Sequence, residues 1–340
     1  MTTPVDNRSE SDYSGKVRAI SERLRSWSGP IVLATHIDPD GDAVGSTLAL
    51  SRALQALGRA TTVSLTPPRF LAFLTAPGEL VPQLETLAPG TLLIALDAGA
   101  ASRVAGVPLG DAALTINIDH HGTNERFGDI HLVDPSKAAT AQIVKDIVEQ
   151  LGLAWTPELA TPCLLGILTD TGFLRFGNTR PAVLRAAAEL LASGLDYAEL
   201  TDRLQWRPQS YYPLLAQVMA TVEFPLGGEV ALARVTESMR EDLSEEILDS
   251  EDFIGVIRYA EGIRVAVLLK EQGDTTKVSV RTRGGVSAQA ICLMLGGGGH
   301  VPAAGATIAA AIDTARERVL TAVRKELDQT DRRGSPEPRR

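Results

Sequence analysis

Cysteine is scarce in this chain of 340 residues, which contains only two. Cys163 and Cys292 lie far apart in apolar segments, so we expect buried free thiols rather than a disulfide or a Cys-x-x-Cys metal site. The sequence also lacks a run of 18 apolar residues that could cross a membrane. The apolar core of a secretory leader is missing from the polar start, MTTPVDNRSESDYSGK. Together these features predict a cytoplasmic protein.

The chain also lacks an excess of positive charge. The formal net charge is −9, and only 4% of the residues are aromatic. A protein that coats long nucleic acid through a basic surface is therefore excluded, and there are few rings on which the bases of a long single strand could stack. A short nucleic acid held in a local basic pocket stays compatible with this composition.

The first half of the chain alternates short apolar runs with helical periods. Apolar runs occur at 31–35, 61–65, 91–97, 113–119 and 129–134, and helical periods at 43–57 and 137–150. This alternation predicts an α/β domain with a doubly wound, mostly parallel sheet and helices on both faces. In such sheets, ligands bind beyond the carboxyl ends of the strands.

The second half changes from helical to strand-like patterns. Consecutive helices are predicted from 157 to about 222, and the strands 229–235, 263–270 and 275–283 follow, with helices at 287–295 and 312–327. A smaller, mixed α/β C-terminal domain is therefore expected. The predicted organisation is a disordered N-terminus at 1–14, an N-terminal domain at 15–190, a helical linker at 191–223, a C-terminal domain at 224–327 and a disordered tail at 328–340.

An acidic cluster follows the first apolar run. The stretch THIDPDGDAVGS holds a histidine and three aspartates at His36, Asp38, Asp40 and Asp42. An unpaired buried carboxylate costs several kcal/mol or shifts its pKa, so a bound cation is the simplest compensation. The glycines of this stretch, Gly41 and Gly45, are expected to leave room where the backbone approaches that cation.

Two alternatives compete with this cation site. The three aspartates match the first, third and fifth positions of an EF-hand calcium loop, but Ala43 stands where that loop needs glycine, and Ala49 where it needs a bidentate glutamate. The other alternative is a solvated turn with Asp42 as the N-cap of the following helix, and it stays open on this motif alone.

Further acids and imidazoles close other apolar runs. Asp97 ends TLLIAL, the triplet Asp119-His120-His121 ends TINI, and Asp170 closes an apolar helical stretch. Because the carboxyl ends of parallel strands meet at one edge of a sheet, these groups are expected to converge. Oxygen and imidazole ligands without thiolate favour Mn²⁺ or Mg²⁺ over structural zinc. Their number suits two ions about 3.5–4 Å apart.

Taken together, these motifs resemble one known family. H-x-x-P-D-G-D-A-x-G-S, an aspartate ending a later strand, D-H-H, T-D-T-G and G-G-G-G-H-x-x-A-A-G occur in the order seen in the DHH family of phosphoesterases with the DHH-associated C-terminal domain. Within that family the chain looks most like the NrnA-like subgroup of nano-RNases and pAp phosphatases. The resemblance covers about residues 16 to 325, so it implies that 15–190 is the catalytic, metal-binding domain and 224–327 the substrate-binding domain.

The resemblance also implies a role for each residue of the metal site. His36 and Asp40 hold one ion, Asp97 bridges both, and the second ion is held by Asp42, His120 and Asp170. Asp119 orients a neighbouring imidazole, and His121 faces the phosphate or supports the metal ligands. The implied catalytic residues are Asp42, Asp97, His120 and His121. Mn²⁺ is the expected ion, with Mg²⁺ and Co²⁺ as alternatives.

Substrate contacts are implied in both domains. The glycine-rich stretch 296–305 has no lysine at the P-loop position, so an NTPase is excluded, and the resemblance assigns Gly297, Gly298, Gly299 and His300 to the substrate. Arg281 is implied to bind a second phosphate or a similar anionic end of the substrate, while Ser102 and Arg103 are implied to hold a phosphate in the first domain. A cleft between the two domains is expected to limit substrate length.

The implied activity is Mn²⁺-dependent hydrolysis of very short oligoribonucleotides to mononucleotides and of 3′-phosphoadenosine 5′-phosphate (pAp), by water that two metal ions activate. Short DNA and linear or cyclic dinucleotides fit the same site, and a homodimer is compatible with the sequence. The alternatives are a single-stranded exonuclease or a polyphosphatase of the same superfamily, and a non-catalytic nucleotide sensor.

Overall fold

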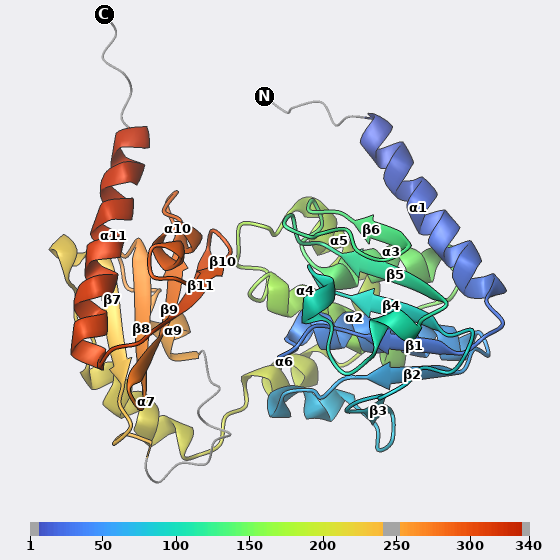
Figure 1. The fold of residues 1–340 in the computed structure, drawn as a ribbon, viewed down its shortest axis with the longest axis horizontal. Coiled ribbons are helices and arrows are strands. Elements are labelled where there is room, and N and C mark those ends of the chain that lie inside the picture. The colour runs from blue at the N-terminus through green and yellow to red at the C-terminus, as the bar shows by residue number, and fades with distance from the viewer. Residues whose placement is uncertain (1–6, 241–251, 335–340) are drawn as a thin grey trace, which may run out of the picture. The chain divides into compact units, whose positions relative to one another are not determined.

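The protein is described by a computed structural model over residues 7–240 and 252–334. Its contacts divide the chain into two compact units, Met1–Trp206 and Arg207–Arg340 (Figure 1). Over the described ranges, each helix is too short or too polar to span a lipid bilayer. Cys163 and Cys292 are buried free thiols, as predicted.

The first unit is built on a six-stranded sheet in the order β3-β2-β1-β4-β5-β6, and every strand pair is parallel. The strands are β1 (Ile31–Ala34), β2 (Thr61–Ser64), β3 (Leu80–Val81), β4 (Leu92–Leu96), β5 (Leu114–Asp119) and β6 (Ile130–Val133). The order reverses between β1 and β4, so the chain leaves these two neighbouring strands in opposite directions. In an open α/β sheet, a ligand site is expected beyond the strand ends at this point.

The two faces of this sheet are covered differently. Side chains such as Leu33 and Ile94 enter a large core with the helices, whereas Val32 and Leu93 pack against Leu84 and other apolar residues of the segment 84–112. The α/β class and the parallel sheet are confirmed. Among the described residues of this unit, 7–206, the second face is covered by irregular chain and the short 3-10 helices η2 (Ala101–Arg103) and η3 (Leu109–Asp111), and not by α-helices as predicted. The helical elements of the first unit are α1 (Asn7–Ser26), α2 (Gly41–Ala56), η1 (Arg69–Leu74), α3 (Thr140–Gln150), α4 (Pro157–Asp170), α5 (Pro181–Leu191) and α6 (Tyr197–Gln205).

Helices α2 and α4 approach closely at glycine positions. A Cβ on Gly45 would lie 2.4 Å from the carbonyl oxygen of Pro162 and 2.9 Å from the amide nitrogen of Gly166, and a Cβ on Gly41 would lie 2.4 Å from the Thr169 side chain. We predicted that these glycines leave room for a cation, and this explanation is wrong. They are required by the packing of α2 against α4, which places Asp42 and Asp170 on neighbouring helices.

Gly45→Ala is expected to lower the free energy of unfolding by about 1–3 kcal/mol, because the added methyl meets backbone atoms that cannot move independently. Urea denaturation followed by circular dichroism measures this change. Gly15→Ala is the matched control, since a Cβ at Gly15 in α1 meets no atom within 4 Å. It is expected to raise stability by up to about 1 kcal/mol through helix propensity. Equal stability of the Gly45→Ala variant and the wild type would contradict the packing argument.

Both ends of the described chain are helical where disorder was predicted. Helix α1 begins at Asn7, inside the segment 1–14, and the hydroxyl of Tyr13 donates a 2.6 Å hydrogen bond to Asp146 Oδ2 of α3. At the other end, α11 (Ile312–Gly334) continues past residue 327, and Arg333 donates to the buried carboxylate of Glu326. Both helices also place apolar side chains in a hydrophobic core, Ile20 and Leu24 from α1 and Val319 and Val323 from α11, so the polar composition of the chain ends alone is misleading. Residues 1–6 and 335–340 lie outside the described residues.

The second unit is built on a five-stranded mixed sheet in the order β10-β11-β9-β8-β7. The strands are β7 (Val230–Val235), β8 (Val265–Gln272), β9 (Thr275–Thr282), β10 (Gly298–Gly299) and β11 (Ala303–Ile308), and the helical elements are α7 (Tyr211–Ala220), η4 (Leu226–Gly228), α9 (Asp252–Ile257), α10 (Ala288–Leu293) and α11. Helices α10 and α11 cover one face, and α7 and α9 the other. The mixed α/β class of this unit is confirmed.

Strands β10 and β11 are the part of this sheet that the sequence did not predict. They form a hairpin in which Gly298 pairs with Gly305 and Gly299 with Ala304. The inward side chains of β11 include only alanines before Ile308, so the alternation of large apolar and polar residues that marks a strand is absent. The glycine-rich stretch is therefore partly a strand edge rather than a loop throughout.

Candidate metal centre

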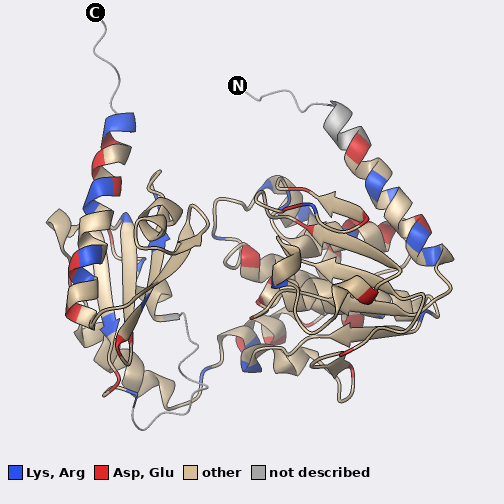
Figure 2. Ribbon diagram, in the orientation of Figure 1, with Lys and Arg blue, Asp and Glu red and all other residues tan. Residues whose placement is uncertain are grey.

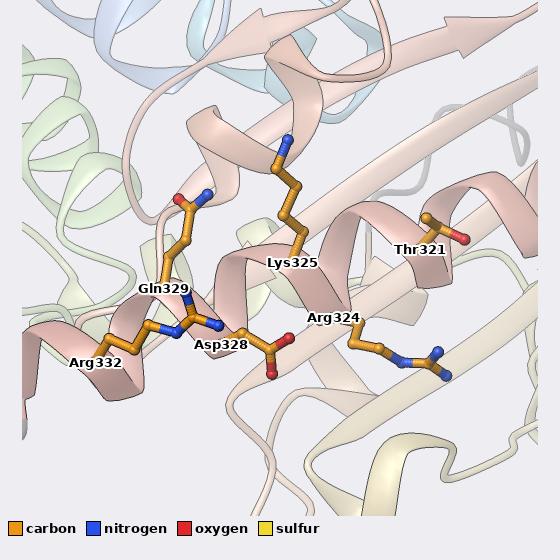
Figure 3. Close-up of a pocket in the computed structure, with 6 residues that line it drawn as sticks. All are labelled: Thr321, Arg324, Lys325, Asp328, Gln329 and Arg332. Atoms are coloured by element: carbon orange, nitrogen blue, oxygen red, sulfur yellow. The ribbon is translucent and has the colours of Figure 1, made fainter.

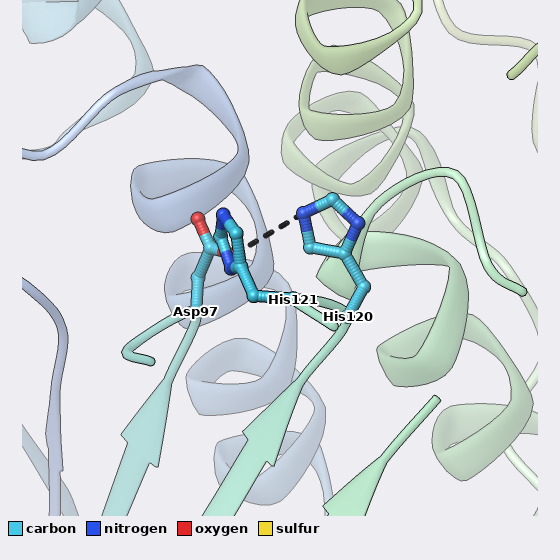
Figure 4. Close-up of side chains that lie close together, drawn as sticks. All are labelled: Asp97, His120 and His121. Atoms are coloured by element: carbon cyan, nitrogen blue, oxygen red, sulfur yellow. Dashed lines mark ion pairs between the residues drawn. The ribbon is translucent and has the colours of Figure 1, made fainter. Parts of the chain in front are cut away.

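Strand ends bring the predicted ligands of the first unit together. His36 follows β1, Asp97 follows β4, and His120 and His121 follow β5; Figure 4 shows Asp97 and the two imidazoles facing one another. Three groups each offer ligand atoms within 4.8 Å of one another. They are His36 with Asp40 and Asp97; Asp97 with His120 and His121; and Asp42 with His120 and Asp170.

Asp97 stands between two of these groups. Its Oδ2 lies 3.7 Å from Nε2 of His36, and its Oδ1 lies 3.7 Å from Nε2 of His120. The residue is only 2% exposed, and its backbone has φ of 55°, a left-handed conformation that costs energy for a residue other than glycine. The backbone thus turns sharply as β4 ends, and each carboxylate oxygen faces a different imidazole.

The His36 side is held by local contacts. Nδ1 of His36 lies 2.7 Å from the carbonyl oxygen of Ile37 and can donate to it, so Nε2 is left to face Asp97. Asp40 is exposed, and its Oδ1 accepts from the amides of Asp42 and Ala43. Asp40, not Asp42, is therefore the N-cap of α2. Asp38 is exposed and has φ of 54°.

The His120 side includes the completely buried Asp42. Nε2 of His120 lies 3.1 Å from Oδ2 of Asp170 at the end of α4, and 3.9 Å from Oδ2 of Asp42. Asp42 is completely buried, and its two oxygens accept hydrogen bonds of 2.5 and 2.8 Å from the amides of Thr140 and Ala141 at the start of α3. The helix end stabilises the carboxylate, because its free amides and its positive end both favour negative charge.

A buried polar network supports the Asp-His-His turn. Oδ1 of Asp119 accepts from Nδ1 of His121 at 2.7 Å and from the amides of His120 and His121. Its Oδ2 accepts from Asn124 Nδ2, which also lies 2.9 Å from Oδ1 of Asn117. Asp119 thus contacts the imidazole of His121.

Asn117 and Asn124 were not singled out from the sequence. Asn117 is completely buried in β5 and donates to the carbonyl oxygen of Ala98, which follows Asp97. The available signal was an amide side chain in the middle of the apolar run TINI, since a buried polar side chain in a strand needs partners. The network therefore ties the turn after β4 to the turn after β5.

Without a cation, these acids hold protons at unusually high pH. Burial, followed by the charges of neighbouring aspartates, raises the pKa values of Asp42 and Asp97 well above the ordinary range, and burial also raises the pKa of Asp170. Burial alone would lower the pKa of His120, but the hydrogen bond to Asp170 and the charge of Asp42 raise it to about 9. The deprotonated carboxylates repel one another in this buried cluster, and bound divalent cations would remove that repulsion.

The donor set fits hard or borderline divalent ions. It consists of carboxylate oxygens and imidazole nitrogens, and no thiol belongs to any of the three groups. An EF-hand calcium loop is excluded, since the side chain of Asp40 caps α2 and the ligand groups come from distant segments.

The two residues predicted to hold a phosphate in the first unit lie in a turn whose backbone is hydrogen-bonded to the backbone next to His36. Ser102 and Arg103 form η2, both are exposed, and the carbonyl oxygen of Arg103 accepts from the amide of Ile37 at 2.9 Å. An isolated bridge joins His36 to Val104. The turn that bears Arg103 is thus fixed beside the ligand turn after β1. His131 is in β6 and is partly exposed.

The predicted substrate residues of the second unit gather around the β10–β11 hairpin. Arg281 of β9 is opposite Ala303 of β11, and His300 is exposed in the turn of the hairpin, where its amide donates to the carbonyl oxygen of Ala303. A Cβ on Gly297 would lie 2.1 Å from the carbonyl oxygen of Gly305, and one on Gly299 would lie 2.6 Å from Cα of Ala304. These two glycines are needed for the hairpin itself, whereas Gly298 is exposed with open space around it.

A groove on α11 contrasts with the metal centre. It is lined by Thr321, Arg324, Lys325, Asp328, Gln329 and Arg332, which all come from this one helix (Figure 3). Charges of both signs alternate along α11 in Figure 2, and the side chains in Figure 3 spread apart rather than converge on one point. This surface is typical of a solvated helix face.

Comparisons with known proteins agree with this geometry. The sequence model described as the DHH family, N-terminal domain, matches residues 30–167, and that of the DHHA1 domain matches 228–329. The bifunctional oligoribonuclease and PAP phosphatase NrnA of Thermus thermophilus is 56% identical over 94% of this chain and 97% of its own length. The chain therefore belongs to the DHH family of phosphoesterases, in which it is NrnA-like.

More distant proteins resemble this chain in structure or in sequence. The crystal structure of an exopolyphosphatase-related protein from Bacteroides fragilis has a TM-score of 0.83 at 20% identity, and the match covers 93% of this chain and 98% of that one. The cyclic-di-AMP phosphodiesterase GdpP of Geobacillus thermodenitrificans is 25% identical over 90% of this chain but only 49% of its own. The structural likeness confirms the two-domain α/β fold.

Proposed function

We propose that this protein hydrolyses very short oligoribonucleotides to mononucleotides and removes a phosphate from pAp. The observation that carries the proposal is the convergence of three ligand groups, two of them sharing Asp97, at the strand ends of the first unit. The 56% identity to a bifunctional oligoribonuclease and PAP phosphatase, across nearly the whole of both chains, supports the substrate classes. The relation to a cyclic-di-AMP phosphodiesterase makes dinucleotides further candidate substrates.

The proposed cofactor is a pair of divalent ions, with Mn²⁺ preferred over Mg²⁺ and Co²⁺. His36 and Asp40 hold one ion, Asp42, His120 and Asp170 hold the other, and Asp97 contributes one oxygen to each. Two bound ions of this kind supply an activated water and neutralise charge on the phosphate. The facing oxygens of Asp97, each 3.7 Å from a different imidazole, support this assignment.

The side chains of the centre have separate tasks in this proposal. Asp119 holds the imidazole of His121 through the 2.7 Å contact with Nδ1, which leaves Nε2 of His121 to face a substrate phosphate. Asp42 and His120 keep the buried side of the centre rigid, because α3 amides and Asp170 fix their positions. No protein nucleophile is required.

Substrate binding is proposed for both domains. Ser102 and Arg103 hold a phosphate in the catalytic domain, 15–190. In the substrate-binding domain, 224–327, Arg281 binds the second anionic end, and His300 with the backbone of Gly297, Gly298 and Gly299 binds the phosphate or base. We further propose that the protein acts in the cytoplasm, and a homodimer is its proposed assembly.

A turnover panel tests the function. RNA of 2, 3, 5, 12 and 24 nucleotides, pAp and polyphosphate are each incubated with Mn²⁺, Mg²⁺ or Co²⁺, and product release is followed by chromatography. The expected result is turnover of pAp and of the shortest RNAs, fastest with Mn²⁺. Preference for the 24-mer or for polyphosphate would identify the exonuclease or polyphosphatase alternative, and binding without turnover would identify a nucleotide sensor.

Arg281→Ala is expected to lower kcat/KM for a dinucleotide by about 10–100-fold, mainly through KM, since a charge-assisted hydrogen bond contributes about 1.5–3 kcal/mol. Arg324→Ala is the matched control, because Arg324 is an exposed arginine of the same unit, on the solvated face of α11. Equal kinetics of both variants and the wild type would remove Arg281 from the substrate site.

A further inference from the structure

The first turn of α3 is capped by a residue from a distant segment. Ala139, at the N-cap, has no side-chain oxygen that could accept the first amides of the helix, and these amides need a partner. Asp42 provides it, because its two carboxylate oxygens accept from Thr140 and Ala141. Asp42, in the first turn of α2, therefore holds the start of α3 in place.

Thr140 makes a second contact with the centre through its side chain. Its hydroxyl donates a 2.9 Å hydrogen bond to Oδ1 of Asp97, and the residue is completely buried. Threonine is stiff about χ1 because it is branched at Cβ, so a well-packed threonine holds its hydroxyl in one place. The hydroxyl of Thr140 thus fixes the rotation of the Asp97 carboxylate.

The hydroxyl of Thr140 contacts only one of the two carboxylate oxygens of Asp97, Oδ1. Oδ1 of Asp97 is the oxygen that faces His120, whereas Oδ2 faces His36. The amide of Thr140 also contacts Asp42, which belongs to the group with His120 and Asp170. Both contacts of Thr140 therefore reach ligand atoms on the His120 side of the centre.

We propose that Thr140 is a positioning residue that orients Asp97 and Asp42 for the ion on the His120 side, and so makes the two metal sites unequal in affinity. It is not itself a ligand. This inference rests on the proposed two-metal function, and it adds a residue of α3 that the ligand motifs do not include. An ion on the His36 side would be held through Oδ2 of Asp97, the oxygen that faces His36, whereas Thr140 donates to Oδ1.

Thr140→Val tests the proposal, because valine keeps the shape and the backbone amide but cannot donate. Mn²⁺ binding to metal-stripped protein is measured by calorimetry and by electron paramagnetic resonance. We expect the ion on the His120 side to bind about 10–100-fold more weakly, as is typical when a residue that supports a metal ligand is lost. Thr140→Ser keeps the donor and should restore binding to within a few fold.

Ligand deletions assign the effect to one ion. In a His36→Ala background only the His120-side ion remains. Adding Thr140→Val should weaken the binding of this ion by the same factor as in the otherwise unchanged protein. In an Asp170→Asn background the remaining ion is on the His36 side, and Thr140→Val should change its binding less than about threefold. Such double-variant comparisons separate a specific coupling from a general loss.

The control for loss of a buried threonine hydroxyl is Thr91→Val. Thr91 is completely buried at the opposite end of β4 from Asp97, and its hydroxyl donates to the carbonyl oxygen of Ala88. Metal binding should be unchanged in this variant. Thermal unfolding of the metal-free proteins checks the fold, and Thr140→Ala gives the same comparison if the valine variant does not fold.

Equal weakening of both ions, or of neither, would overturn the role of Thr140 while two-metal binding stands. Failure of the wild-type protein to bind two Mn²⁺ ions would instead overturn the proposed function. The two outcomes are distinguished by the wild-type titration alone.

Discussion

Asp97→Asn is expected to lower kcat/KM on a dinucleotide by about a thousandfold, while the fold is retained. Asn keeps the shape of the side chain and can still accept from Thr140, but it supplies only one neutral oxygen where the carboxylate offers two charged ones. Loss of charge stabilisation at a two-metal centre costs several kcal/mol, and each 1.4 kcal/mol is about tenfold in rate. Steady-state kinetics with Mn²⁺ and circular dichroism measure the two effects.

The control for this variant comes from the same acidic stretch. Asp38 is exposed and has φ of 54°, a conformation that asparagine tolerates well, so Asp38→Asn removes a nearby charge without strain. Activity within about threefold of wild type is expected for it. If Asp97→Asn and Asp38→Asn lost the same amount of activity, the loss would be due to the change in net charge and not to the loss of a bridging ligand.

Metal removal is expected to abolish activity, and the affinity for added Mn²⁺ is expected to rise steeply with pH. In the metal-free protein, burial and neighbouring charge raise the pKa values of Asp42 and Asp97, and the pKa of His120 is raised to about 9. Ions bind the deprotonated groups, so loading displaces protons. Each displaced proton makes the apparent affinity about tenfold higher per pH unit.

The same shifts set how stability depends on pH. Because the folded, metal-free protein holds protons that the unfolded chain releases, the unfolding free energy falls as pH rises from the ordinary aspartate pKa of 3.8 towards the His120 value of about 9. Bound ions remove this penalty. The increase in Tm on adding Mn²⁺ should therefore be larger at pH 8.5 than at pH 6.

Calorimetry from pH 6 to 8.5, in buffers of different ionisation enthalpy, measures the protons released. Metal-free Asp97→Asn is the control, since it lacks one raised carboxyl and should lose less stability than wild type as pH rises. An affinity for Mn²⁺ that does not change with pH would show that the centre is already deprotonated before loading.

Short-range patterns were enough to predict much of the first unit. The runs that end at Ala34 and Leu96 became parallel strands because each is a continuous apolar stretch, buried on both faces, and the run that ends at Asp119 is buried in the same way although it includes Asn117. From that class alone, side chains at the carboxyl ends of the strands were expected to converge. His36, Asp97 and His120 could be found in this way, since they lie at or just beyond the ends of these runs, whereas Asp40 and Asp42 belong to the motif before and in α2, and Asp170 ends a helix.

Other features depended on contacts between distant residues. The hairpin of β10 and β11 consists largely of glycine and alanine and carries no alternating pattern, so only its pairing with β9 makes it a strand. The segment 1–14 was predicted to be disordered because its composition is polar, yet from residue 7 it belongs to α1, and Tyr13 donates a hydrogen bond to Asp146 of α3. The reason for Gly45 likewise appears only where α2 meets α4.

The amino-acid sequence by itself determined most of the strands and helices, the ligand candidates and the family, because each of these lies in local periodicity and in motifs of fixed spacing. Tertiary structure decided which oxygen of Asp97 faces which imidazole, that Asp42 caps a helix 98 residues further on, and that Thr140 and Asn117 support the centre. A hydrogen bond depends on the distance and angle between two atoms, and for residues so far apart along the chain those are set only when the strands and helices pack.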